Sequence, residues 1–113
     1  MNPYLFVINV IPMPENKDCA DIASAIAHVW VISEDRESAK NRALDYVTSY
    51  LWEIIDFEHE FEIQPQQIPV LHEDEALLYK KALQFGVAAD YIAHPKIPGK
   101  IDDPVIKKRL RRP

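Results

Sequence analysis

The chain has 113 residues, 48% of them hydrophobic and 27% charged, which is typical of one globular domain and not of a disordered or fibrous protein. Its apolar runs are too short or too interrupted to cross a bilayer and its start lacks signal-peptide features, so we expect a cytoplasmic protein without a membrane span. One cysteine and two glycines exclude a disulfide framework, a cysteine-rich zinc site, the P-loop and the dinucleotide-binding fingerprint.

The formal charge of -5 is divided unevenly along the chain. Residues 96–113 hold seven Lys and Arg against two Asp, whereas residues 1–95 hold six basic and sixteen acidic groups. We therefore predict a single domain over residues 1–95 and a basic, proline-containing tail over residues 96–113. Such a tail is either solvated and flexible, or an electrostatic clamp within one subunit or between two. Because phosphate contacts supply most non-specific affinity for nucleic acid, the acidic body is not expected to bind nucleic acid.

Two strands are predicted in the first third of the chain. Residues 3–11 form an apolar run rich in β-branched and aromatic side chains, which predicts a strand that is apolar on both faces and lies inside the sheet. Residues 22–33 alternate in the manner of a second strand. The alternative is a short helix over residues 18–27, since Ala20, Ala23 and Ala27 recur at helical spacing.

Two helices and a third strand follow. Ser33, Glu34 and Asp35 offer N-cap candidates before apolar residues at steps of three and four, which predicts a helix over residues 35–52. Apolar and acidic residues alternate over residues 55–63 and predict a strand with one buried face. A second helix with an acidic first turn is predicted over residues 73–85, with Gly86 at its end, and residues 87–93 add either a helical turn or a short strand.

These elements predict an α+β fold, a two-layer ββαβα sandwich. We expect a three-stranded sheet with both helices on one face and a flexible basic C-terminal tail. The first strand is apolar on both sides, so the face without helices also needs a cover. We therefore expect a homodimer, or failing that a contact with another protein.

A row of carboxylates at every second position marks the third strand: Asp56, Glu58, Glu60 and Glu62. Spaced about 7 Å apart on one strand face, they would concentrate negative potential and attract a hard cation or a basic partner. The alternative is an edge strand that carries charge to discourage aggregation.

Two histidines are the best ligand or pocket candidates. His28 lies beside Trp30 on the second strand, and His59 lies between two phenylalanines on the third. If they share a face they could come within ligand distance or form a pH-sensitive pair, whereas the alternative is unrelated packing. His72 and Glu75 also stand at ligand spacing, but a third ligand is missing locally and helix capping explains them. The sequence therefore assigns no catalytic residue, metal site or cofactor.

The C-terminal stretch KKRLRR resembles a localisation or nucleic-acid patch in composition. Its interaction candidates are Lys107, Lys108, Arg109, Arg111 and Arg112; a solvated end is the alternative. Taken together, the sequence favours a non-enzymatic binding or regulatory module that acts through protein–protein contacts. The alternative is a small enzyme or metal-dependent protein with a site near His28 and His59.

Overall fold

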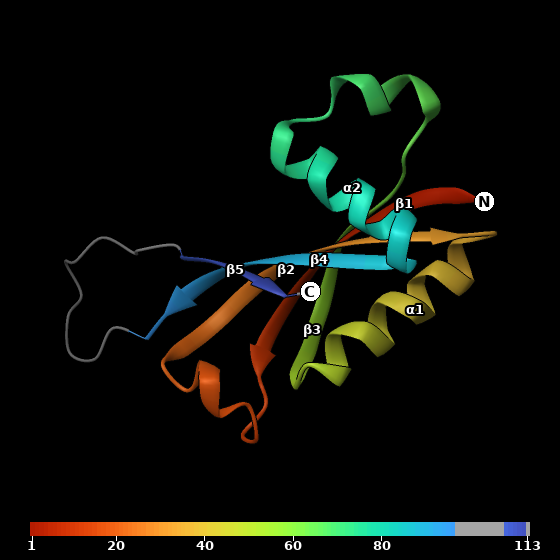
Figure 1. The fold of residues 1–113 in the computed structure, drawn as a ribbon. Helices are drawn as coiled ribbons and strands as arrows, with labels where there is room; N and C mark the ends of the chain where they lie inside the picture. Colours follow the sequence, from red (N-terminus) through yellow and green to blue (C-terminus); the bar gives the residue numbers. More distant parts are fainter. Residues whose placement is uncertain (97–107, 113) are drawn as a thin grey trace.

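A computed structural model of the chain describes residues 1–96 and the backbone of residues 108–112. Its helices and strands follow one another in the order β1 (Asn2–Pro12), η1 (Lys17–Cys19), β2 (Ile22–Ser33), α1 (Arg36–Ser49), β3 (Trp52–Glu62), η2 (Pro65–Val70), α2 (Glu73–Phe85), β4 (Val87–Pro95) and β5 (Lys108–Arg112), as drawn in Figure 1. The predicted α+β class is confirmed.

The core is an antiparallel sheet of four long strands in the order β3-β1-β2-β4, and β5 pairs with the outer edge of β4. The prediction of a three-stranded sheet was therefore wrong. The missing strand is β4, over residues for which the sequence left a helical turn as an alternative. Gly86 has a left-handed backbone (φ 87°) that ends α2 and turns the chain into β4.

β1 lies inside the sheet, paired with β2 on one side and β3 on the other. This is the position expected for a strand that is apolar on both faces. β2 begins at Ile22, so the alternative helix over residues 18–27 was wrong; only Lys17–Cys19 make a helical turn.

α1 covers one face of the sheet. Its buried residues Ala39, Ala43 and Val47 pack in a cluster with alternate residues of β1, among them Phe6 and Ile8. The adjacent residues of β1 point to the opposite face.

α2 covers that opposite face. The prediction that both helices lie on one face was therefore wrong. Leu78 and Ala82 of α2 pack in a second cluster with Leu5, Val7 and Trp30. A sheet whose central strand is apolar on both sides requires two covers, and the chain supplies the second itself. The apolar face from which we predicted a homodimer is thus partly covered within one chain, and the dimer stays a prediction.

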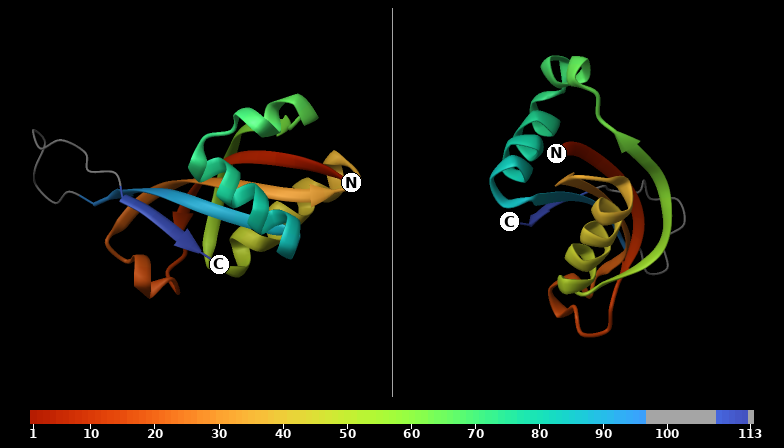
Figure 2. Two further views of the ribbon diagram at one scale, coloured as in Figure 1. Left: turned by 45° about the horizontal axis from the view of Figure 1, so that its top comes forward. Right: turned by 90° about the vertical axis from the view of Figure 1, so that its right-hand side faces the viewer.

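The sheet curves around α1, as the right-hand view in Figure 2 shows. Trp52 at the start of β3 stacks on Tyr91 of β4 with ring centroids 5.1 Å apart, and both side chains are fully buried. Two strands separate β3 from β4 in the sheet, so this contact requires the two sides of the sheet to curl toward each other.

α1 is shorter than the helix predicted over residues 35–52. Asp35 is its N-cap, and the carboxylate of Asp35 accepts a hydrogen bond of 2.7 Å from the backbone N–H of Ser38. At the other end, Leu51 has a positive φ of 66° that breaks the helix, and Trp52 already belongs to β3.

Replacing Asp35 by Ala should lower the free energy of unfolding at neutral pH. The hydrogen bond from the Ser38 backbone holds the pKa of Asp35 below its ordinary value of 3.8, so the stabilisation is present above that pH and is lost as the pH falls through the lowered pKa. Urea denaturation should thus show the difference between wild type and Asp35→Ala shrinking below about pH 4. Asp35→Asn, which keeps a neutral acceptor, is the control; a difference that does not change with pH would contradict the cap.

Replacing Gly86 by Ala should destabilise the chain by about 1–2 kcal/mol, because a side chain at this left-handed position is strained. The added Cβ would also lie 3.2 Å from Nη2 of Arg42, although that flexible side chain can move. Gly86→Asn should lower the free energy of unfolding by less than Gly86→Ala, since Asn tolerates the left-handed region. Equal urea midpoints for Gly86→Ala and wild type would count against this turn.

Candidate functional site

The first turn of α2 stands over β2 and β4. Its three acidic residues, Glu73, Asp74 and Glu75, are favoured at a helix N-terminus by the helix dipole. Glu75 reaches back, and its Oε1 accepts a hydrogen bond of 3.1 Å from the backbone N–H of His72. One turn later, Leu78 is buried against the sheet, so the acidic turn is fixed in place above it.

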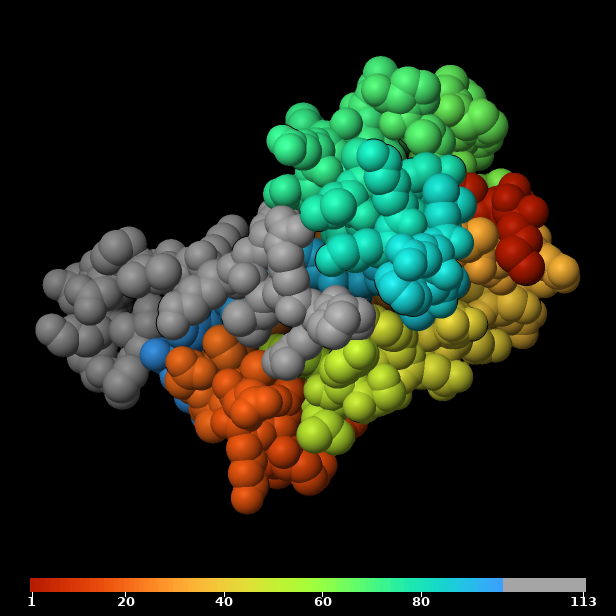
Figure 3. Space-filling view, viewed as in Figure 1, coloured from red at the N-terminus to blue at the C-terminus, as the bar shows by residue number. Residues whose placement is uncertain are grey.

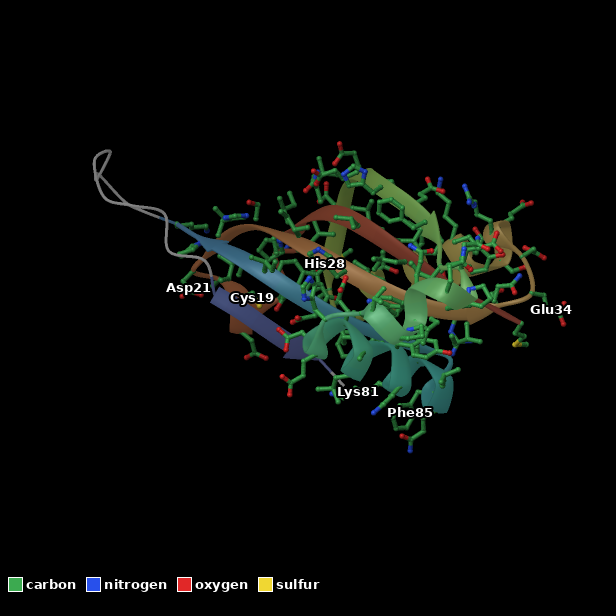
Figure 4. All side chains as sticks on the ribbon, turned by 90° about the horizontal axis from the view of Figure 1, so that it is seen from above. Cys19, Asp21, His28, Glu34, Lys81 and Phe85 are labelled. Carbon is green, nitrogen blue, oxygen red and sulfur yellow. The ribbon has the colours of Figure 1, made fainter. Side chains whose placement is uncertain are left out.

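A pocket of about 300 Å³ lies between this turn and the sheet. Residues of α2 and its N-cap form one side and residues of three strands form the other; the lining comprises Leu5, His28, Trp30, His72, Asp74, Glu75, Leu78, Asp90 and Ile92. Figure 4 shows His28 on β2 near the start of α2. In Figure 3 the chain from η2 through α2 forms one continuous lobe over the sheet.

A histidine and an aspartate face each other across two strands in this pocket. The register pairs His28 of β2 directly with Asp90 of β4, which brings their Cβ atoms to about 5 Å. Asp90 is only 1% exposed and is the one carboxylate in β4, whose other residues are mostly apolar. At such low exposure, electrostatic interactions with the carboxylate are much less screened than at the surface.

The rest of the pocket wall is apolar and aromatic. Trp30 is 1% exposed, and its ring makes an edge contact with Tyr79 of α2 at a centroid distance of 6.2 Å. Asp74, by contrast, is exposed at the acidic first turn of α2. The arrangement offers an apolar wall for an alkyl or planar group and carboxylates for a positive charge.

The structure brings His28 and Trp30 together in the pocket and leaves His59 outside it. Both histidines are register partners of Val7 and so share a face, a condition that the sequence had left open. β1 lies between their strands, however, which separates them by about 10 Å. The exposed ring of His59 stacks on Phe61 at a centroid distance of 5.5 Å.

The acidic row of β3 does not occupy one face. Two irregularities in the pairing of β1 with β3 change which residues face which side. Asp56 pairs with Asn9 and accepts a hydrogen bond of 2.8 Å from its side chain, while Glu60 pairs with Phe6 on the α1 face. Glu58 and Glu62 are exposed. β3 is an edge strand, in agreement with the alternative reading of this row as protective charge.

Glu60 also ties α1 to β3. Its Oε2 lies 3.0 Å from Nζ of Lys40, and the same ammonium group lies 4.5 Å from the ring centre of Phe57. This carboxylate is therefore engaged within the chain.

The basic C-terminal candidates fall partly outside the described residues. The tail was predicted over residues 96–113. Residues 97–107 of it, Lys107 included, lie outside the described residues, whereas the backbone of Lys108–Arg112 forms β5. β5 lies beside β4, at the edge of the sheet opposite β3. Within one chain these five residues thus follow β4 and not the acidic row of β3.

Sequence reasoning missed Asp90. A single carboxylate in the apolar stretch from Val87 to Ala93 is the signal that could have found it, because charged groups are almost never fully buried without a reason. His72 and Glu75 were noticed as a pair, but their neighbours in the pocket come from β2 and β4, far away in the sequence.

Within residues 1–96 and 108–112 we find no cluster of three or more His, Cys, Asp or Glu arranged to hold a metal ion. Nor does that part of the chain include a helix with the length and apolar character needed to span a bilayer. Cys19 is buried, 2% exposed. The chain matches no protein-family model, no curated protein and no solved structure.

Proposed function

We propose that this chain is a non-enzymatic binding module that recognises a basic, extended segment of a partner protein. The observation that carries the proposal is the pocket beside β4. Its lining combines the carboxylates of Asp74, Glu75 and the buried Asp90 with apolar side chains. The partner segment would run along the outer edge of β4 and place one Lys or Arg side chain in the pocket.

The pocket chemistry suits a Lys or Arg side chain. Carboxylates form charge-assisted hydrogen bonds with ammonium and guanidinium groups, while the alkyl stem of either side chain packs on apolar surface. At about 300 Å³ the pocket is at the lower end of the range for ligand sites, about 300–1,000 Å³, which favours a single side chain over a larger cofactor.

The edge of β4 suits an extended segment. Strand addition provides affinity through backbone hydrogen bonds, and pockets for alternate side chains provide specificity. The pairing of β5 with β4 supports this, since β5 is a basic strand and the register sets Arg111 opposite Asp90. The formal charge of -10 on residues 1–95 would further attract a basic partner.

The test uses a fluorescently labelled peptide with the sequence KKRLRR and the full chain at low salt, measured by fluorescence anisotropy. Asp90→Asn should weaken binding at least about tenfold, since a hydrogen bond to a buried charge is worth about 1.5–3 kcal/mol. Asp74→Asn, at an exposed carboxylate, should weaken it by less than about fivefold.

Glu58→Gln is the matched control, because it removes one negative charge at the opposite edge of the sheet. Binding should persist in this variant and be absent for a peptide with Gln in place of Lys and Arg. If all three neutralising variants lose affinity equally, the peptide recognises only net charge and the proposed site is wrong.

One observation favours a second function, an enzyme that uses His28 as a general base. An aspartate beside a histidine is the arrangement that orients catalytic histidines, and Asp90 lies opposite His28. No Ser or Cys is among the residues that line the pocket as described, so the attacking group would be water.

Hydrolysis of arginine esters and arginine anilides, assayed with His28→Gln and with Glu58→Gln as control, separates the two functions. We expect no turnover by the wild-type chain. Turnover that disappears only in His28→Gln would establish the enzyme in place of the binding module.

A further inference from the structure

The outer edge of β4 already carries a basic strand. Four of the five residues of β5 are Lys or Arg. Its backbone pairs antiparallel with β4, with Arg111 opposite Asp90 and Arg109 opposite Ile92, and both β4 residues line the pocket. β5 therefore follows the path along β4 that we assign to a partner segment, as Figure 4 shows for the ribbon.

We infer that β5 is a tethered competitor: the C-terminal strand of the chain occupies the binding edge of β4 and must leave before a partner segment pairs there. This inference rests on the proposed function and adds its regulation. The partner must then be a basic segment that outcompetes KRLRR.

The connection between β4 and β5 is long enough to let β5 leave. The ladder holds Ala93 opposite Lys108, about 5 Å apart, whereas the fourteen residues between them could span roughly 45–50 Å when extended. β5 can thus detach without any change in β4. While attached by this connection, it remains at an effective concentration on the order of 1 mM.

β5 is also weakly held for a strand. It has five residues and lies at the edge of the sheet, where local opening requires the least free energy. A free segment of the same sequence therefore binds with a similar intrinsic constant and competes with β5 by concentration.

The effect of β5 on peptide affinity follows from its effective concentration of about 1 mM. If β5 and a free KKRLRR peptide share a dissociation constant of about 100 µM, a tethered strand at about 1 mM lowers the apparent affinity for the peptide roughly tenfold. A change that detaches β5 from the edge of β4 should therefore raise the apparent affinity for the peptide roughly tenfold.

The experiment compares peptide binding to the full-length wild type, Arg111→Glu and Arg36→Glu. Arg111→Glu places a carboxylate opposite Asp90 and should raise the affinity for the peptide about tenfold. Arg36→Glu makes the same change in net charge at an exposed position at the start of α1 and should leave the affinity unchanged. Leu110→Pro removes one backbone donor from β5 without changing charge, and should act like Arg111→Glu.

Amide hydrogen exchange of Ala89, Tyr91 and Ala93, which direct their backbone N–H groups toward β5, provides a readout that does not depend on peptide binding. Exchange along β4 should accelerate in Arg111→Glu and in Leu110→Pro but not in Arg36→Glu, because β5 protects this edge in the wild type.

The outcomes are distinguishable. Equal peptide affinity in the wild type and Arg111→Glu, with Asp90→Asn still weaker, would overturn the tethered competitor and leave the binding module standing. No binding to any variant would overturn the proposed function and this inference with it. A wild-type dimer in sedimentation that Arg111→Glu dissociates would show that β5 pairs with a second copy, and would overturn the competitor within one chain.

Discussion

The stack of Trp52 on Tyr91 holds together the two sides of the sheet on the α1 face. In a flat sheet, three strand spacings would separate β3 from β4 by about 14 Å. The ring centroids are 5.1 Å apart, so the sheet must curl around the stack. Small side chains favour this close approach, because six alanines belong to the same buried cluster as the two rings and the buried residues of α1, at positions 25, 27, 39, 43, 89 and 93.

The curl of the sheet around α1 also affects how α2 covers the opposite face. A sheet that closes around α1 presents a convex surface to α2, and a straight helix of 13 residues covers only part of such a surface. α2 packs on β2 and β4, while the exposed His59 and Phe61 lie at the far edge on β3. The pocket forms where the start of α2 lies over β2 and β4, so its position depends on the curvature set by the aromatic stack.

Much of the fold follows from local pattern. The apolar run of β1, the alternation of β2, and the capped periodicity of α2 with Gly86 at its end were all predicted with nearly the observed bounds, because neighbouring residues determine these features. The face that each helix covers was not predictable, since it depends on contacts between distant segments. The site was predictable only in part: His28 and Trp30 were chosen, but Asp90 reaches His28 through the pairing of β2 with β4, which no local pattern reveals.

The acidic row of β3 shows a different limit. Its alternation is perfect in the sequence, yet the strand includes two irregularities against β1, and each changes the face of the residues that follow. The period of two therefore predicted the strand correctly, but it placed all four carboxylates on one face, which was wrong. A bulge bends its strand and increases the local twist, so two irregularities on β3 are in keeping with the curl of this sheet.

The two tryptophans of the chain lie on opposite sides of the sheet. Trp52 is buried in the cluster beneath α1, and Trp30 is buried in the cluster beneath α2, next to the pocket. Each layer of the core therefore carries its own fluorophore. With one tryptophan replaced by phenylalanine in turn, the emission of the other reports the packing of a single layer, and loosening of the α2 layer can be observed separately from loss of the curled sheet.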